Sequence, residues 1–490
     1  MLLILLWQAE LADACIFKTI NMKNIFKSVL IPSMVLVIGF ASCKKDSANP
    51  NDQTPAPENL ILSGEIKSSL SLKENSTYTL KGRVSVTNNS VLTIPAGTQI
   101  LVESAASASD KGALIIGRGS KLNINGTREK PVVFTSAASA KAPGDWIGII
   151  VMGKASTNGT GRLLNLAGHT VSNDTQFGGS DDMDNSGSIK YLRVEYAGGL
   201  NPAQEEEWAV DMTSGLSMNG VGSGTTIENV MVKHSRDDAF QFVGGTVNAK
   251  YLIAYNNGDD NFDFDRGYRG KLQFIISYNT TGSTVAIRAH GMESLNDKDA
   301  SEFLPYTRPV ISNMTIIGPQ GTDTDMTRQS QGIYIRKNTR FNVQNSIIAG
   351  YSNGGLMLCP KTKPLLVNNQ GSEFKYNLVN ADTQTRSFTY DNGPSGIVII
   401  PDPEVEAIAI QQTTFQTPSL NRNKVVATTE LQLKGLYAST PDLSPASGSS
   451  AMVNANLTGS DFSTFFTAAS HVGAIGTDNW TASGTWVNWQ

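Results

Sequence analysis

Six aspartates between positions 237 and 265 are the densest group of side chains with possible chemistry in the sequence. They are Asp237, Asp238, Asp259, Asp260, Asp263 and Asp265. Carboxylate oxygens are hard ligands that suit Ca²⁺, and a pair of carboxyl groups can hydrolyse a glycosidic bond. Aspartate in a turn also caps backbone groups without any further role. Calcium binding, glycan cleavage and a structural role are therefore three interpretations of this cluster.

The spacing of these aspartates indicates that they are stacked in space. The hexapeptide Asp-Asp-Ala-Phe-Gln-Phe at 237–242 returns as Asp-Asp-Asn-Phe-Asp-Phe at 259–264, 22 residues later. A unit of this length without a helix is typical of one coil of a parallel β-helix, whose coils stack about 4.8 Å apart. Each aspartate of the first pair then lies over its counterpart in the second, and such like charges raise a pKa or recruit a cation.

The strand that follows each aspartate pair predicts which side chains face inward. Alternate residues of a strand share one face, so Phe262 and Phe264 point into the core, while Asp263 and Asp265 point to solvent. No EF-hand spacing is present, so a calcium site would be assembled across coils. The predicted ligands are Asp237, Asp259, Asp260, Asp263 and Asp265.

A second repeated pattern supports the same architecture. A β-branched residue, a polar residue and Asn precede an apolar run at 227–232, 311–316 and 343–348. No convincing amphipathic helix occurs, and Asn-Gly hairpin turns of the kind that join antiparallel strands are rare. The sequence therefore predicts an all-β fold, a single right-handed parallel β-helix with long loops and a C-terminal cap, rather than a two-sheet sandwich.

The N-terminal region reads as a leader with a lipid-attachment site. Lys23 and Lys27 precede an apolar run at 29–40 that is shorter than the roughly 20 residues of a membrane-spanning helix. Small residues then lead into Cys43, as in a bacterial lipobox, and Met22 is the natural start. The predicted organisation is an N-terminal extension plus lipoprotein signal peptide at 1–43, a flexible tether at 44–60, the β-helix at 61–425 and a capping region at 426–490.

Composition excludes several classes of partner. The formal net charge is −4 and only 17% of residues are charged, so no basic excess exists to bind nucleic acid. No Gly-rich phosphate-binding loop is present, and no nucleotide is expected. The three cysteines cannot form a disulfide scaffold, which leaves Cys359 as a probable buried apolar residue.

Several longer motifs carry a family resemblance. Leu-Thr-Ile-Pro-Ala-Gly-Thr at 92–98, Gly-Asp-Trp-Ile-Gly at 144–148, the segment 237–246 and His-Val-Gly-Ala-Ile-Gly at 471–476 resemble those of a group of Bacteroidetes cell-envelope lipoproteins. That group is similar to the pectin-lyase-like β-helix superfamily. The resemblance implies a fold and an outer-membrane location, with the polypeptide on either the periplasmic or the external side. It implies no established reaction.

Two functional hypotheses follow. The leading one is a lipid-anchored, non-catalytic protein with a glycan-binding, adhesion or surface-scaffold role, held at the membrane through Cys43. The alternative is a polysaccharide hydrolase or lyase that uses Asp238, Asp260, His290 and Arg336, which occur in the same order as the catalytic residues of polygalacturonases. The sequence departs from that pattern because the Asn-Thr-Asp motif is missing and Lys337 adjoins the arginine directly. The sequence establishes no cofactor, and Ca²⁺ is the one candidate.

Overall fold

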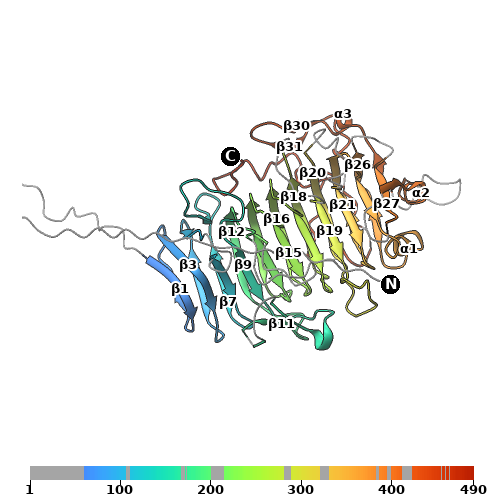
Figure 1. Cartoon of the computed structure of the whole chain (residues 1–490). Coiled ribbons are helices and arrows are strands. Elements are labelled where there is room, and N and C mark those ends of the chain that lie inside the picture. Colours follow the sequence, from blue (N-terminus) through green and yellow to red (C-terminus); the bar gives the residue numbers. More distant parts are fainter. Residues whose placement is uncertain are drawn as a thin grey trace, which may run out of the picture. The chain divides into compact units, whose positions relative to one another are not determined.

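The computed structural model describes most of the chain from residue 60 to residue 490. The described residues exclude 106–110, 167–170, 173, 200–213, 281–288, 320–329, 382–385, 394–398, 411–421, 454, 458 and 463. Cys43 and the predicted leader and tether up to residue 59 lie outside the described part. Within it, the strands follow one another along one axis in the order of the sequence (Figure 1).

The strands form the three parallel faces of a β-helix. In the first face, neighbouring strands come from successive coils and pair in parallel, except for an antiparallel last strand. It contains the C-terminal parts of β1 (Leu60–Ile66) and β3 (Thr77–Val86), then β6 (Ala113–Ile116), β9 (Gly148–Met152), β13 (Leu216–Asn219), β15 (Phe240–Val243), β17 (Phe262–Asp265), β19 (Met292–Leu295), β21 (Ile333–Arg336), β24 (Leu356–Leu358), β27 (Phe388–Asp391) and β28 (Ile399–Pro401).

The second face is built in the same way from the next segment of each coil. It contains β2 (Leu70–Ser71), β4 (Val91–Pro95), β7 (Lys121–Asn125), the N-terminal parts of β12 (Gly187–Glu195), β14 (Thr226–Lys233), β16 (Asn248–Tyr255), β18 (Lys271–Tyr278) and β20 (Val310–Ile317), then β22 (Asn342–Gln344) and β25 (Glu373–Lys375).

The third face completes each coil. It contains the N-terminal parts of β1 and β3, the C-terminal parts of β12, β14, β16, β18 and β20, and five further strands. These are β5 (Gln99–Val102) and β8 (Val132–Ser136) in the early coils, and β23 (Ile347–Tyr351), β26 (Leu378–Ala381) and β29 (Lys424–Val425) in the late coils. The predicted parallel β-helix is confirmed.

The repeated Asn of the sequence pattern marks the corner between the second and third faces. Asn229, Asn313 and Asn345 each have a positive φ, between 53° and 58°. A left-handed residue at this point turns the chain from one face to the next, and Asn tolerates that conformation better than most residues. Aromatic residues with positive φ occupy the same corner in other coils, at Tyr191, Tyr251, Phe274 and Tyr376.

The interior is filled by ladders of apolar side chains. Phe240 stacks on Phe262, and Phe242 stacks on Phe264, each with ring centroids 5.2 Å apart. All four rings are buried in the main core, as the 22-residue repeat predicts. Their inward direction fixes the alternate residues of the same strands on the outer side of the first face.

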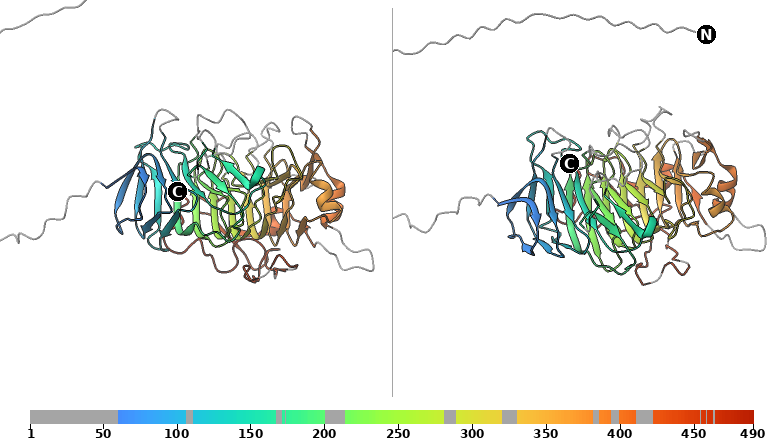
Figure 2. Two further views of the ribbon diagram at one scale, coloured as in Figure 1. Left: turned by 90° about the horizontal axis from the view of Figure 1, so that it is seen from below. Right: turned by 60° about the horizontal axis from the view of Figure 1, so that its bottom comes forward.

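Short elements and the C-terminal segment cover the solenoid. Helix α2 (Pro403–Ile410) buries Val405 and Ala409 in the main core, beside the last strands of the first face. The sequence shows no convincing amphipathic helix there. The aromatic C-terminal segment, which belongs to the predicted capping region at 426–490, runs along the side of the coils (Figure 2). There Trp486 and Trp489 join an apolar cluster on the outer side of the third face.

The remaining elements are short. They are the 3-10 helix η2 (Thr160–Arg162), the hairpin of β10 (Leu163–Asn165) and β11 (Gln176–Gly178), α1 (Lys363–Val367), α3 (Thr428–Leu431), and the hairpin of β30 (Leu433–Gly435) and β31 (Asp442–Pro445). Among the residues described, none of the helices has the length and apolar character needed to span a bilayer.

Candidate functional site

A column of polar side chains runs beside the strands of the first face, one member in each of four successive coils. A carboxylate oxygen of Asp238 accepts the backbone N–H of Asp260 at 3.1 Å, and a carboxylate oxygen of Asp260 accepts the N–H of His290 at 2.5 Å. Nδ1 of His290 then accepts the N–H of Gln331 at 3.0 Å. We call these four residues the acceptor ladder, because each of the first three caps a backbone donor of the next coil.

The acceptor ladder is buried. Asp238 and Asp260 are 8% and 7% exposed, and His290 has no exposed surface. Burial, together with nearby carboxylates, raises the pKa of both Asp238 and Asp260 well above the ordinary value of 3.8. The raised pKa values reflect the cost of keeping negative charges out of water. Such groups suit backbone capping better than contact with a polymeric substrate.

The outer side of the first face carries a second polar column. Gln241, Asp263 and Glu293 are in register on β15, β17 and β19. The sequence predicts that Asp263 and Asp265 face solvent, but they are only 7% and 9% exposed. They do point away from the core, as the inward Phe ladder requires, and the error concerns burial alone: this outer side is not open to water at that point. The alternation of side chains along a strand predicts which side of the sheet each one faces. It does not predict whether other residues cover that side.

Asp263 has the clearest electrostatic cost. Burial first, and then the neighbouring carboxylates Asp265 and Glu293, raise its pKa well above 3.8. Its Oδ2 accepts a long hydrogen bond of 3.4 Å from Gln241, while its Oδ1 has no hydrogen-bond partner. This carboxyl group is therefore held in a setting that favours its protonated form.

Arg336 lies on the same face as the acceptor ladder but is engaged elsewhere. Its guanidinium donates to Glu293 at 3.2 Å and lies over the ring of Tyr334, with Cζ 5.5 Å from the centroid. The same Glu293 oxygen is 3.9 Å from Nε2 of His290. The four residues of the polygalacturonase-like order thus gather on one face, where Glu293 connects the His to the Arg. Sequence order alone gave no signal for that connecting role.

Three carboxylates could hold a cation. Oxygen atoms of Asp237, Asp238 and Asp259 lie within 4.8 Å of one another. The first and third are half-buried, and the second is buried. Oxygen-only ligands at this density fit the preference of Ca²⁺. The group includes Asp238, which the sequence does not place among the calcium ligands. It shares only Asp237 and Asp259 with the predicted set.

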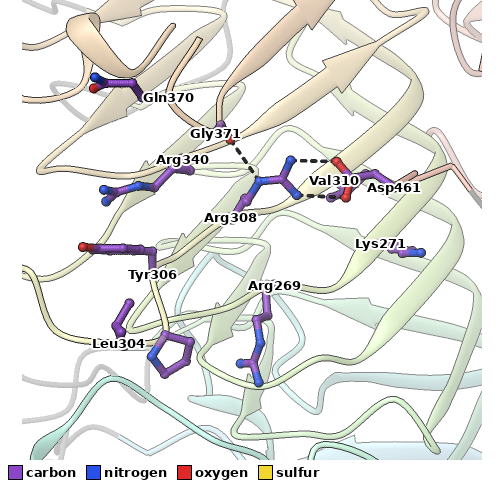
Figure 3. Close-up of a pocket in the computed structure, with 11 residues that line it drawn as sticks. Arg269, Lys271, Leu304, Tyr306, Arg308, Val310, Arg340, Gln370, Gly371 and Asp461 are labelled. Carbon is purple, nitrogen blue, oxygen red and sulfur yellow. Dashed lines mark hydrogen bonds and ion pairs between the residues drawn. The ribbon is translucent and has the colours of Figure 1, made fainter. Parts of the chain in front are cut away.

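A different part of the surface contains a hollow. A pocket of about 480 Å³ lies at the corner that joins the first face to the second (Figure 3). We call it the basic corner, because four of its lining side chains are cationic and one is acidic. Its lining consists of Arg269, Lys271, Leu304, Pro305, Tyr306, Arg308, Val310, Arg340, Gln370, Gly371 and Asp461.

Internal contacts fix the shape of the basic corner. Arg308 donates to both carboxylate oxygens of Asp461, at 3.1 and 2.7 Å, and to the carbonyl of Gly371 at 3.0 Å. The guanidinium of Arg340 lies over the ring of Tyr306, with Cζ 3.3 Å from the centroid, and Figure 3 shows the two side chains beside one another. Both arginines are therefore pre-positioned rather than extended into solvent.

An apolar rim borders this pocket. Leu304 belongs to the lining and is 63% exposed, and Phe303, the residue before it, is exposed to the same extent. The loop that carries them is held by Asp297, whose carboxylate accepts the backbone N–H groups of Asp299 and Ser301 at 2.9 and 3.0 Å. The cationic residues of the basic corner are far apart in sequence, and only the stacking of coils brings them together.

The comparison with known families agrees with this architecture. Residues 64–425 match the model of the pectate-lyase-like β-helix domain. The chain belongs to the pectate-lyase-like β-helix family. No curated protein matches it.

Two solved structures are similar to this pectate-lyase-like β-helix protein. One is the Dettilon tailspike protein, with 12% identity, a TM-score of 0.21, and coverage of 62% of this chain and 60% of the tailspike chain. The chain thus spans less than two thirds of the tailspike's length. The other is the alginate lyase from Paenibacillus sp. str. FPU-7, with 14% identity, a TM-score of 0.15, and coverage of 59% and 76%.

Proposed function

We propose that this pectate-lyase-like β-helix protein is a non-catalytic glycan-binding protein of the cell envelope, and that the basic corner is its binding site. The observation that supports this most is the pocket itself. It has a volume typical of small-ligand sites, hydrogen-bond donors on several coils, and the exposed Leu304 beside the ring of Pro305 in its lining. Apolar side chains beside polar donors match a sugar, which has apolar C–H faces and a hydroxyl edge. The family's relation to pectate lyases also favours a glycan ligand.

The geometry of the acceptor ladder argues against the alternative of a hydrolase or lyase that uses Asp238, Asp260 and His290. A general acid or base must come within hydrogen-bond reach of the substrate. Here each of these side chains already accepts a backbone N–H from the next coil, and each is buried. The fourth candidate, Arg336, is paired with Glu293. We therefore assign these residues to the fold rather than to a reaction.

Incubation of the protein, expressed from residue 46, with a panel of neutral and acidic polysaccharides tests this proposal. We expect retention of at least one glycan in affinity electrophoresis and no release of reducing sugar or unsaturated product, with or without Ca²⁺. Cleavage that is lost in Asp260→Asn, while the variant keeps the wild-type melting temperature, would establish the enzyme instead. Failure to bind any glycan would contradict the proposed function.

We also propose that Asp237, Asp238 and Asp259 bind Ca²⁺. Their convergent oxygens support this, and a bound cation would offset the burial and the carboxylate repulsion that together raise the pKa of Asp238. A ligand at 100 times its Kd stabilises a fold by about 2.7 kcal/mol, so we expect Ca²⁺ to raise the melting temperature and a chelator to lower it.

Asp259→Asn should abolish the response to Ca²⁺, whereas the exposed Asp299→Asn should preserve it. Equal melting temperatures for the wild type in Ca²⁺ and in chelator would contradict the calcium proposal.

The membrane attachment is a further part of the proposal. It rests on the lipobox-like sequence that ends at Cys43. We expect the full-length protein, produced in a bacterium with lipoprotein processing, to incorporate labelled palmitate and to sediment with the outer membrane. Cys43→Ser should incorporate no label. Recovery of the wild type in the soluble fraction without label would contradict the anchor.

A further inference from the structure

We infer that the basic corner selects acidic glycans, those that carry carboxylate or sulfate groups, over neutral ones. This inference rests on the proposed function, since it names the class of ligand for the same pocket. The first observation is a register of arginines. The N–H of Arg308 donates to the carbonyl of Tyr268 at 2.7 Å, and the N–H of Arg340 donates to the carbonyl of Thr307 at 3.0 Å.

These backbone bonds place Arg269, Arg308 and Arg340 in one column, one residue in each of three successive coils. Strand pairing supports the same register, because Lys271, Val310 and Asn342 are partners on β18, β20 and β22. Parallel strands lie about 4.8 Å apart. The column therefore brings three arginines of successive coils to one pocket, with their backbones at the regular spacing of parallel strands.

Carboxylates near the pocket offset part of the positive charge of the arginine column. Asp461 is the only acid in the lining, and although burial raises its pKa, hydrogen bonds from Arg308 and Asn342 lower it below 3.8 overall. It therefore stays ionised and neutralises Arg308. Just outside the lining, Asp182 pairs with Arg269.

Arg340 has a weaker partner. Glu302 lies 4.0 Å from its guanidinium and is 72% exposed, so water screens the pair.

The other cationic side chains of the lining are partly buried. Arg269 uses one terminal nitrogen for Asp182 and for Ser156, while its Nη1 is buried without a hydrogen-bond partner. Its guanidinium is therefore held in place at the pocket wall, with 28% of the side chain exposed.

Lys271 opens β18 and is half-buried at the edge of the hollow. Its Nζ lies 6.0 Å from the ring centroid of Phe466. The lining thus holds the fixed guanidinium groups of Arg269 and Arg340 and the ammonium group of Lys271.

This donor set decides the class of ligand. Neutral hydroxyl groups need both donors and acceptors, but the charged groups of the lining are mostly donors. Guanidinium groups form their strongest hydrogen bonds with carboxylate, sulfate and related oxyanions. An acidic glycan would therefore gain more from this lining than a neutral glycan of the same shape.

Matched ligands test the inference. Calorimetry would compare oligogalacturonate with the same oligomer after reduction of its carboxyl groups, and sulfated with unsulfated cello-oligosaccharide. We expect at least one acidic member to bind about tenfold more tightly than its neutral partner, with an affinity that falls as salt rises. The two pairs also show whether carboxylate or sulfate is preferred.

Variants locate the binding. Lys271→Gln and Arg340→Gln should each weaken binding of the acidic oligomer about tenfold and leave binding of its neutral partner nearly unchanged. Lys121→Gln is the control, because Lys121 also opens a strand of the second face and is half-buried, several coils away. Melting temperatures identify any variant that has lost its fold, and Lys271→Gln, at a partly exposed site, is the variant expected to keep it.

The outcomes separate the two proposals. Equal affinity for acidic and neutral oligomers would overturn the inference and leave the glycan-binding function standing. Acidic oligomers that bind Lys271→Gln and Arg340→Gln as tightly as wild type would also overturn it, since the site would lie elsewhere. Absence of binding by all four oligomers and by the wider panel would overturn the proposed function itself.

Discussion

The acceptor ladder and the basic corner differ in what their charged groups contact. In the ladder, Asp238 and Asp260 are buried and each accepts a backbone N–H from the next coil. At the basic corner, the charged groups border a hollow of about 480 Å³, and Arg269 retains a donor without a partner. The first group stabilises the stacking of the coils, whereas the second borders the pocket that we propose as the ligand site.

The difference shows that a high density of charge in a sequence does not by itself locate a pocket in this solenoid. Adjacent acids such as Asp259 and Asp260 attract attention because they are neighbours in the chain. The cations of the basic corner are separated by a whole coil each, yet backbone bonds between coils bring Arg308 and Arg340 into one column. The two regions differ in whether their charged side chains border the hollow and in whether a hydrogen-bond donor lacks a partner there. The density of charged residues along the sequence does not separate them.

The largest effect should come from the acceptor ladder. Asp260→Ala removes the acceptor of the His290 N–H and leaves a buried donor without a partner, which costs about 1–3 kcal/mol. Asp260→Asn keeps an oxygen in that place and removes the buried charge that burial disfavours, so it should be at least as stable as wild type at neutral pH. Chemical denaturation of both variants measures the difference. Equal destabilisation by Ala and Asn would show that the carboxamide oxygen does not replace the capping acceptor.

A smaller effect with the opposite sign is expected at Asp263. Because its pKa is raised above 3.8 in the fold, the folded protein binds a proton that the unfolded chain releases. The stability that this group contributes is therefore lost as the pH rises from about 3.8 toward the pKa of Asp263 in the folded protein. Asp263→Asn should thus be more stable than wild type at neutral pH in chelator, by about 1.4 kcal/mol for each unit of pKa shift.

The advantage of Asp263→Asn should vanish as the pH approaches 3.8, the ordinary value for this group. Unfolding free energies across that pH range provide the measurement, with the exposed Asp299→Asn as the control. A stability difference that is independent of pH would mean that the charge of Asp263 is not the cause.

The smallest effect on stability is expected at the basic corner. Lys271→Gln changes a partly exposed side chain whose Nζ lies 6.0 Å from the ring centroid of Phe466, and changes at such surface sites are usually within about 0.5 kcal/mol. Thermal unfolding of this variant beside Asp260→Ala therefore tests the contrast between the two regions directly. A loss as large as that of Asp260→Ala would place Lys271 in the fold rather than in a binding site.

The sequence predicted those parts of the structure that repeat exactly from coil to coil. The Phe240–Phe262 and Phe242–Phe264 stacks follow from the 22-residue offset. The Asn of the second pattern lies where a positive φ turns the chain between faces. In both cases a residue type and a fixed spacing carry the physical requirement.

Other features have no such local signal. The burial of Asp263 depends on what covers the outer side of its strand, and alternation within the strand cannot show that. The position of α2 against the core depends on the apolar surface left by the last coils. The basic corner depends on turns of different length, which place Arg269, Arg308 and Arg340 in register although 39 and 32 residues separate them in sequence.

One calorimetric series separates the roles of the acceptor ladder and the basic corner most directly. It measures the binding of an acidic oligosaccharide to the wild type, Asp260→Asn and Lys271→Gln. We predict that Asp260→Asn binds within about twofold of wild type and that Lys271→Gln binds about tenfold more weakly. Loss of binding in folded Asp260→Asn, with wild-type affinity in Lys271→Gln, would contradict it and place the ligand on the acidic face.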